Sequence, residues 1–491
     1  MTDTIQRDLP PPPPPPSRHR RRDIRNTPLP IVAFVAVLVA LGVFVNWWLV
    51  AFIGLLVVMI FLHELGHFIA AKKGGMKVTE FFIGFGPRLW SFKRGETEYG
   101  LKAIPAGAYV KVIGMHNLEE VPPEDEPRTY RQASYPRRMA VALAGSTMHF
   151  LQAFVILMIL YVGFGVPDRS DFRIDQIVAG SPAAEAGMQP GDHPLAVDGE
   201  PVTEFSDLGR LLRGKGGQPV TITYERDGEV PTATTVVGER LSEAGADAID
   251  GRDGLQARDQ ILAVDGRPVS GYREFATIAA VGETYTVDIG RSNAVCAVEV
   301  TVRELPPPSQ ATTGFLGVAA TYPEKRVGVV DAAGRSIGDI GSLTKVAVTG
   351  IAKFLTPSNL VGFVSDTFKE RDDTAADCRV ITEADERRPL SIVGIGRLAT
   401  DAGESGGAAF LELFVVFNVF IGLFNLLPSL PFDGGHAVIA TYERIRSRRG
   451  RRYFVDMNKV MPVATVVTVI FVVIGVLALG RDIYDPIRLG G

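Results

Sequence analysis

The sequence is poor in several residue types that define common classes of protein. It contains only two cysteines among 491 residues, Cys296 and Cys378, and they lack the close spacing of a cysteine metal site. A disulfide between them and two unpaired thiols are both consistent with the sequence. The net charge is only −4, so the composition gives no argument for nucleic-acid binding, and no nucleic-acid partner is expected.

Charged residues are nearly absent from four long apolar segments, which lie at 29–62, 139–166, 410–427 and 461–479. Each of the last three has close to the roughly 20 residues that a helix needs to cross the hydrocarbon core of a membrane. The first is too long for one span and divides at Asn46–Trp48, where polar and aromatic groups suit a membrane interface. It predicts either two helices, the first at 29–45, or one tilted helix with an amphipathic lead-in.

Two basic segments indicate how the chain lies in a membrane. The N-terminal tail contains a proline run at Pro10–Pro16 and an arginine cluster at 18–22, and a second arginine cluster lies at 443–452. The tail at 1–28 has little that could form a core and is predicted to be disordered. Cytoplasmic loops carry an excess of Lys and Arg, so both segments are predicted to be cytoplasmic. We therefore expect a cell-membrane protein whose central region is extracytoplasmic.

A metal-binding pattern follows the first apolar run without a break. His63 and His67 lie four residues apart, which places both on one face of a helix, where they can ligate one divalent metal. Glu64 would lie beside that metal, where it can take a proton from a bound water. Ionisable residues at membrane depth are costly and commonly functional. The alternative interpretation is a pair of histidines on a buried helix face.

A candidate third ligand, Asp433, follows the third apolar segment. A catalytic zinc site uses three protein ligands and an open position for water. Two prolines interrupt the helix just before Asp433, and Gly434 and Gly435 let backbone approach closely, so we expect the carboxylate in a non-helical turn at membrane depth. An ordinary turn without a metal is the alternative. The predicted ligands of Zn²⁺ are His63, His67 and Asp433.

Together the two motifs resemble those of the site-2 protease family of intramembrane zinc metalloproteases, in its bacterial envelope branch. Phe82–Pro87 and Pro105–Lys111 resemble the family's membrane-reentrant β-hairpin, and Leu390–Arg397 resembles a further family stretch. One departure is visible. The family usually has Gly-Pro and an Asn near the start of its second helix, whereas this chain reads Gly-Ser-Thr-Met-His at Gly145–His149.

The resemblance implies peptide-bond hydrolysis with Glu64 as the catalytic base. It also implies that Asn425 hydrogen-bonds the substrate or its oxyanion, with helix-end capping as the alternative. The hairpin would offer an edge strand to an unwound substrate, so Gly107 and Tyr109 are expected to contact the substrate. An ordinary soluble hairpin is the alternative there. The implied substrates are single-span membrane proteins, such as anti-sigma factors, or remnant signal peptides.

The central region contains an internal repeat. Segments that begin at Gly187 and Gly254 align, and each has a short apolar strand, an Asp-Gly turn and a helix-like stretch. They resemble tandem bacterial PDZ domains at 173–236 and 241–302. Such domains bind peptides by adding a strand to a sheet edge. We expect the pair either to read a processed C-terminus or to exclude substrates with bulky outer domains.

The predicted fold class is a multi-pass α-helical membrane protein with four to five transmembrane helices, a membrane-reentrant β-hairpin and two extracytoplasmic PDZ-like α+β domains. Along the chain this gives a Pro/Arg-rich cytoplasmic tail (1–28), one or two transmembrane helices (29–72), the hairpin (77–118), a transmembrane helix (139–166), the two PDZ-like domains (173–236 and 241–302), a membrane-associated connector with a charged loop (303–404), and two further transmembrane helices (407–436 and 457–480).

The predicted function is zinc-dependent intramembrane proteolysis in a cell membrane, with the active site towards the cytoplasmic side. The alternative is an inactive membrane protein that binds peptides through its PDZ-like pair. Retention of all three candidate ligands and of Glu64 favours the enzyme. A metal transporter would need ionisable residues along several helices, and this chain has few of them.

Overall fold

The computed structural model describes residues 29–115, 118–178, 180–251, 254–291, 294–367, 389–447 and 452–484. The predicted disordered tail at 1–28, the charged loop at 371–388 and Cys378 lie outside these residues. The chain forms two compact units. The first unit is Met1–His149 with Asn425–Ala464, and the second is Phe150–Phe424 with Thr465–Gly491.

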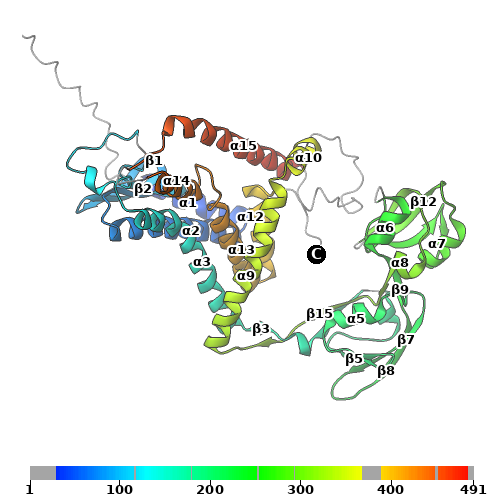
Figure 1. The fold of residues 1–491 in the computed structure, drawn as a ribbon. Coiled ribbons are helices and arrows are strands. Elements are labelled where there is room, and N and C mark those ends of the chain that lie inside the picture. The colour runs from blue at the N-terminus through cyan, green and yellow to red at the C-terminus, as the bar shows by residue number, and fades with distance from the viewer. Residues whose placement is uncertain are drawn as a thin grey trace, which may run out of the picture. The chain divides into compact units, whose positions relative to one another are not determined.

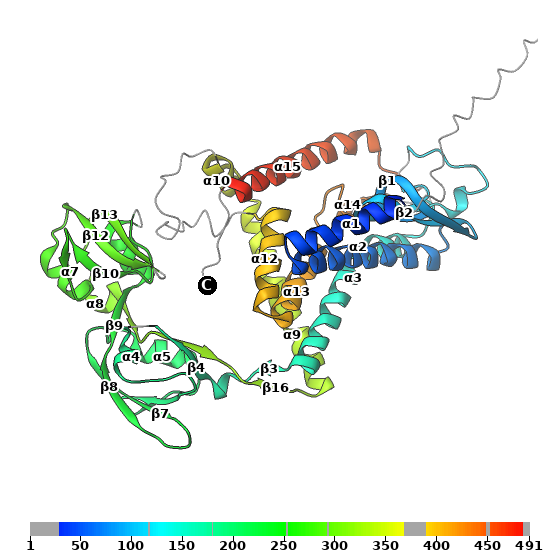
Figure 2. The ribbon, with the colours of Figure 1, turned by 180° about the vertical axis from the view of Figure 1, so that it is seen from behind.

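The first unit contains three helices, which are formed largely by the first two apolar segments of the sequence. Helix α1 (Leu29–Phe44) and helix α2 (Trp47–Lys73) are separated at Asn46, whose side chain accepts a hydrogen bond from the Trp48 amide at 2.7 Å. The structure thus has two helices here, because an N-cap at Asn46 starts a new helix. α1 lies against α2 (Figure 2). Helix α3 (Tyr135–Ile159) continues as a π-helical turn at Leu160–Phe164.

A long antiparallel hairpin follows α2 and packs against it. Its strands are β1 (Val78–Arg94) and β2 (Thr97–Val112), and both fold back, so that residues 80–83 pair with 108–111 on one side and with 98–101 on the other. The Phe81 ring stacks between Phe61 and Phe68 of α2, with ring centroids 5.5 and 5.3 Å apart. At the hairpin turn the Glu96 carboxylate accepts hydrogen bonds from Lys72 at 2.6 Å and from Arg128 at 2.7 and 2.9 Å. Apolar contact and a local ion network therefore fix the hairpin to the end of α2.

A group of mostly apolar helices belongs to the second unit. They are α9 (Val329–Phe354), α10 (Pro357–Thr367), α12 (Ile392–Ser405), α13 (Gly407–Phe424) and the greater part of α15 (Met457–Tyr484). The long helix α9 lies within the stretch expected to be a membrane-associated connector. α13 packs against both α9 and α12.

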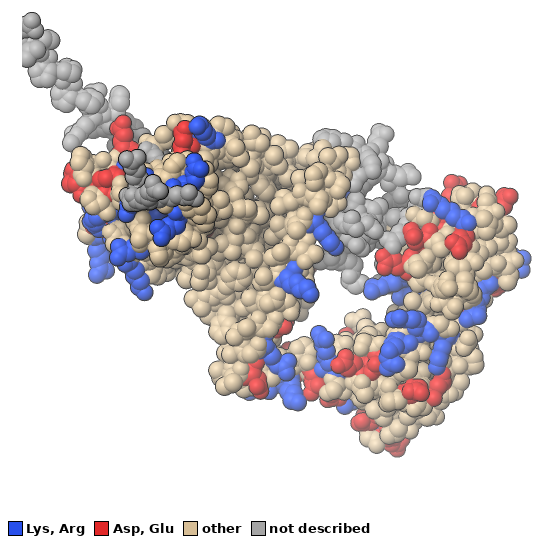
Figure 3. Space-filling view, in the orientation of Figure 1, with Lys and Arg blue, Asp and Glu red and all other residues tan. Residues whose placement is uncertain are grey.

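Among the described residues, four helices are long and apolar enough to cross a membrane: Trp47–Lys73, Tyr135–Phe164, Gly407–Phe424 and Met457–Tyr484. The pair Val329–Phe354 and Pro357–Ser365, bent by 71°, is a fifth candidate. On the face drawn in Figure 3 the charged atoms gather over the β-rich parts of the chain, and the surface over the long helices carries few of them. Four to five candidate spans agree with the expected number by length and composition, but the fifth candidate is the bent pair, whereas the extra helix expected at 29–45 is a shorter apolar helix.

The repeat corresponds to two small α+β folds in the second unit (Figure 1). The first has a four-stranded sheet of order β6-β5-β7-β8, and the second one of order β11-β10-β12-β13. The strands of the first sheet are β5 (His193–Val197), β6 (Glu200–Pro201), β7 (Pro219–Glu225) and β8 (Thr232–Val236), and its helices are α4 (Pro182–Glu185) and α5 (Phe205–Leu212). The second has β10 (Gln260–Val264), β11 (Arg267–Pro268), β12 (Thr284–Arg291) and β13 (Ala294–Thr301), with α6 (Glu243–Asp250), α7 (Tyr272–Ile278) and α8 (Pro308–Ala311).

The second α+β fold is inserted into the first. Strand β15 (Val318–Thr321) comes after the second fold yet pairs with β4 (Arg173–Ile177), and Leu316 is buried in the core of the first fold. Strand β14 (Thr312–Phe315) pairs with β9 (Gly238–Leu241). The first core therefore needs residues that lie well beyond 173–236, within the stretch expected to be a connector. Local sequence patterns carry no information on which distant strands will pair, so this arrangement was not predicted.

The two α+β folds together are connected to the rest of the second unit through one pair of strands. Strand β3 (Val166–Pro167) pairs with β16 (Glu324–Lys325), and the two strands run side by side in Figure 2. Residues 168–323 thus leave and return to the same place in the second unit.

Candidate metal centre

Helix α2 brings two imidazoles together. His63 and His67 are one helical turn apart, and their Nε2 atoms lie 3.1 Å from each other. Their side chains are only 11% and 12% exposed. The apolar run before them continues the helix without interruption, so the spacing of four residues translates directly into a shared face.

Asp433 is the first residue of helix α14 (Asp433–Arg446), and this corrects the expectation of a non-helical turn. The loop from Asn425 to Phe432 folds back on the start of α14, where the Gly434 amide donates to the Asn425 carbonyl at 2.8 Å. A Cβ on Gly434 would lie 2.2 Å from the Leu426 carbonyl oxygen. The glycine thus allows the loop to close against the helix, and the carboxylate projects from the first helical turn.

The three predicted ligands converge although α2 and α14 are far apart in sequence. The Oδ2 atom of Asp433 lies 3.4 Å from His63 Nε2 and 3.2 Å from His67 Nε2. Among the described residues these three form a group of potential ligands with donor atoms within 4.8 Å of one another.

The geometry of this group fits zinc. Ligand atoms bound to one tetrahedral Zn²⁺ at about 2.0–2.1 Å lie about 3.3 Å apart, which matches the three separations. The Asp433 Oδ2 atom is buried and accepts no hydrogen bond within the described chain. Such an oxygen is costly unless a cation completes its environment. Two neutral nitrogens and one carboxylate form a donor set that zinc commonly takes, and they leave a position for water.

Helix α3 forms the wall behind the two histidines. The His67 Nδ1 atom donates to the Val141 carbonyl at 2.7 Å, which fixes the tautomer with Nε2 free to ligate. A Cβ on Gly145 would lie 2.3 Å from the His63 ring and 2.5 Å from His67 Nε2. Gly66 of α2 is equally close to α3, since its Cβ would lie 2.7 Å from the Ala144 carbonyl oxygen. Glycines on both helices therefore allow the backbones to approach.

Glu64 lies beside the group, half-buried, within hydrogen-bonding reach of the Val110 amide of β2. Within the described chain, residues 108–112 of β2 pair with β1 on one side only, whereas residues 98–101 have partners in β1 on both sides. The structure thus brings together a carboxylate, three potential ligands and the backbone of an edge strand.

The residues expected to contact substrate lie at different places. Gly107 and Tyr109 are on β2, but the Tyr109 hydroxyl is held within the hairpin, donating to Glu80 at 2.5 Å and accepting from Lys102 at 2.8 Å. Gly107 has φ +149° and packs under the Phe85 ring. Asn425 contributes its carbonyl to the loop before Asp433, and its side chain is half-buried. A role in substrate binding remains a prediction for all three.

His149 lies beside the candidate site although it belongs to neither predicted metal motif. It is 1% exposed, and its ring centroid lies 4.9 Å from that of His63. His149 follows Gly145 by one turn of α3, so both face the first histidine. The sequence did hold a signal, because His149 falls in the stretch where the chain departs from the family pattern.

A group of two histidines and one aspartate at zinc-ligand distances, with a further carboxylate beside it, is typical of metal-dependent hydrolases. The chain matches peptidase family M50 over residues 51–469 and belongs to that family. It is therefore a metalloendopeptidase and a multi-pass membrane protein, and the predicted family is confirmed.

Curated relatives carry consistent names. The chain is 30% identical over 465 residues to the zinc metalloprotease Rip1 of Mycobacterium tuberculosis, an alignment that covers 88% of this chain and 96% of that protein. It is 27% identical over 463 residues to the zinc metalloprotease Rip1 of Mycolicibacterium smegmatis, with the same coverage of both chains. These names agree with the expectation that zinc is the cofactor.

Proposed function

We propose that this protein is a zinc-dependent intramembrane endopeptidase that cleaves single-span membrane proteins in or near their transmembrane segments. The observation that carries the proposal is the triangle of donor atoms from His63, His67 and Asp433, with sides of 3.1, 3.4 and 3.2 Å. Glu64 stands beside it on a helix apolar enough to cross a membrane.

The three ligands would hold the zinc, and Glu64 would move the proton. Zinc held there would supply Lewis acidity, which would polarise a scissile carbonyl and make a water molecule more acidic. The Glu64 carboxylate takes the proton of that water and then donates it to the leaving amine. Val141 keeps His67 in the ligating tautomer throughout.

The hairpin supports a model for substrate binding. A helical substrate hides its scissile carbonyl in intrachain hydrogen bonds, so it must unwind before hydrolysis. Unwound backbone at membrane depth is tolerated only when its polar groups find partners. The edge at 108–112 of β2, whose Val110 amide lies beside Glu64, has no second neighbouring strand in the described chain and offers such partners by strand addition. We therefore propose that β1–β2 is the reentrant hairpin that receives the substrate.

The zinc assignment predicts about one zinc per chain in protein purified in detergent. His67→Ala and Asp433→Ala should each lower the zinc content sharply, because each removes one of three ligands. Glu64→Gln should keep the metal and lose cleavage, because it removes only the base. Metal analysis and cleavage of a single-span substrate measure the two properties.

The matched control is His193→Ala. This histidine lies in β5, bonded to the Phe172 carbonyl, and should leave the zinc content unchanged. A normal cleavage rate in Glu64→Gln would contradict the mechanism and would leave the peptide-binding alternative in place.

We further propose that the metal centre lies towards the cytoplasm and that the two PDZ-like folds are extracytoplasmic. The support is the arginine cluster at 443–452 and that of the tail at 18–22. Topology reporters fused after Arg452 should report the cytoplasm, and reporters near Gly217 or Gln310 should report the outside. A cytoplasmic signal at Gly217 would reverse the orientation. Anti-sigma factors and remnant signal peptides are the substrate classes that we propose, in the lipid bilayer.

A further inference from the structure

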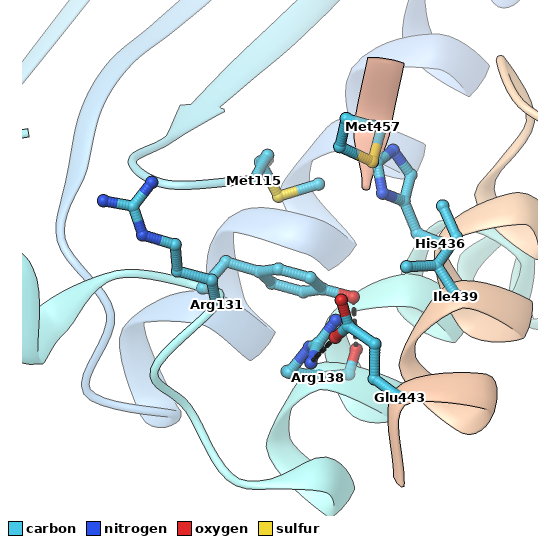
Figure 4. Close-up of a pocket in the computed structure, with 8 residues that line it drawn as sticks. Met115, Arg131, Arg138, His436, Ile439, Glu443 and Met457 are labelled. Carbon is cyan, nitrogen blue, oxygen red and sulfur yellow. Dashed lines mark hydrogen bonds and ion pairs between the residues drawn. The ribbon is translucent and has the colours of Figure 1, made fainter. Parts of the chain in front are cut away.

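A buried ion pair joins the helix that carries Asp433 to the helix behind the histidines. Arg138 of α3 donates to Glu443 of α14 at 2.6 Å, and their side chains are 11% and 7% exposed. Figure 4 shows the two side chains pointing toward each other beside a small pocket, with His436 and Ile439 on the same part of α14. Neither residue belongs to a predicted motif.

The surroundings of the pair hold it in one geometry. The Arg138 guanidinium lies over the Tyr130 ring, 4.9 Å from its centroid. The other carboxylate oxygen of Glu443 accepts from the Val455 amide at 2.8 Å, in the segment that leads to α15. Glu443 thus connects α3, α14 and the start of the last helix, while Arg138 is fixed from both sides.

Arg138 shares a stripe of α3 with the residues that border the metal centre. Val141, Gly145 and His149 follow it at spacings of three, seven and eleven residues, which fall on one side of a helix. Val141 bonds His67, and Gly145 touches both imidazoles. One face of α3 therefore contacts the histidines directly and holds α14 through Arg138.

Thr441 of α14 also makes polar contacts with α3. Within the described chain, Thr441 contributes a contact of 3.3 Å to the Tyr135 hydroxyl and a weak one of 3.9 Å to the Met139 sulfur. A slide of α14 by one residue would move Asp433 about 1.5 Å along the axis. Zinc ligands tolerate displacements of only about 0.2 Å, so such a slide would break the triangle.

We propose that Arg138 and Glu443 are positioning residues that lock α14 in register on α3 and so place the Asp433 carboxylate opposite the two histidines. This inference rests on the proposed function, because it assigns a role to the pair in building the zinc site. It predicts that the pair matters for metal geometry and for the rate of the chemical step, rather than for stability alone.

The test compares Arg138→Met with the matched control Arg137→Met, which removes the same charge from the neighbouring exposed position. In Arg138→Met we expect kcat to fall about 100-fold, the loss typical of a 1 Å misplacement, with KM little changed. The absorption bands of the Co²⁺-substituted protein should shift, because the ligand field at the metal depends on the position of the Asp433 oxygen. Arg137→Met should have the kcat and the Co²⁺ spectrum of the wild type.

Two further variants separate positioning from folding. Arg138→Met with Glu443→Leu removes both charges at similar volume, which commonly preserves stability where a single removal does not. We expect this double variant to recover the melting temperature of the wild type but to keep the altered Co²⁺ spectrum and the low kcat. Arg138→Lys retains the charge and should restore most of the wild-type spectrum.

A double variant with wild-type spectrum and kcat would overturn the inference, as would an Arg138→Lys variant as impaired as Arg138→Met. If Arg138→Met does not fold, these two variants carry the test. A failure of the proposed function looks different, because the wild-type protein would then bind neither Zn²⁺ nor Co²⁺ or would cleave no substrate.

Discussion

At Gly145 the backbone of α3 lies directly against both imidazoles, and this contact determines how the histidines can sit. An added Cβ would meet ring atoms at 2.3 and 2.5 Å, distances at which something must move. The His67 ring cannot retreat freely, because its Nδ1 atom is bonded to the Val141 carbonyl. Even the smallest side chain at this position should therefore disturb the metal centre.

We expect Gly145→Ala to lower zinc affinity by about 100-fold, at the upper end of the effects seen when groups around metal ligands are changed. Competition with a calibrated zinc chelator measures this affinity. Gly54→Ala is the control, because Gly54 lies on α2 with no atom within 4 Å of an added Cβ. Unchanged zinc affinity in Gly145→Ala would contradict this expectation, because it would show that α3 can shift without disturbing the ligands.

The sequence contained the donor atoms of the site but not all of its surroundings. The spacing of His63 and His67 is local, so a helix was enough to predict their shared face. Gly145 and His149 border the histidines only because α2 and α3 pack closely. The sequence pattern within either helix does not predict the distance between the two helices. The roles assigned to Asn425, Gly107 and Tyr109 come from resemblance, and they remain predictions.

Among the elements, the hairpin β1–β2 depends on a small ion network at its turn. Hydrogen bonds from Arg128, and secondarily from Lys72, lower the pKa of Glu96 from its ordinary value to about 2. A carboxyl whose pKa is lower in the folded state stabilises that state above its unfolded pKa, here about 4.5. The stabilisation is lost as the pH falls from there towards 2.

Glu96→Gln should therefore weaken the attachment of the hairpin to α2 by about 1 kcal/mol at pH 7, because exposed ion pairs contribute up to that amount. In hydrogen exchange, the β1–β2 amides of the variant should be less protected at neutral pH, and their protection should fall less between pH 5 and 3. Glu120→Gln, an exposed carboxylate nearby, is the control. Equal protection in Glu96→Gln and wild type would contradict this account of the anchor.

Element boundaries were predictable where a local signal existed. Asn46 caps α2, and the Asp-Gly turns at Asp198 and Asp265 have positive φ angles of 50° and 47°, as the repeat suggested. Asp433 shows the opposite case. Its prolines and glycines favoured a turn, yet the helix starts at that residue, because Gly434 and Gly435 serve close packing of the preceding loop rather than turn formation.

For the whole molecule, the question is whether the two PDZ-like folds exclude large substrates or recruit them. The paired strands β3 and β16 place Pro167 next to Glu324, so residues 168–323 can be removed and the ends joined by a short linker. A deletion that ended at 302 would instead leave β15 without its partner β4. The three proposed metal ligands all belong to the first unit, which this deletion leaves intact.

If the folds act as a size filter, the 168–323 deletion should keep its zinc and cleave full-length substrate without prior trimming. If they recruit substrate, the same deletion should lose cleavage even of a trimmed form. We expect the two folds to act as a size filter. Parallel assays of trimmed and untrimmed substrate in membranes distinguish the two, and loss of activity on both with zinc retained would contradict the filter.

The nested arrangement of the two α+β folds also sets the order in which they can form during synthesis. Every strand and helix of the inserted fold, up to α8, precedes β15 in the chain. The outer fold must wait for Val318–Thr321 before β4 gains its partner, and closing so long a loop is slow compared with local contacts. A ribosome therefore presents the inner fold complete while the outer one still lacks its last strand.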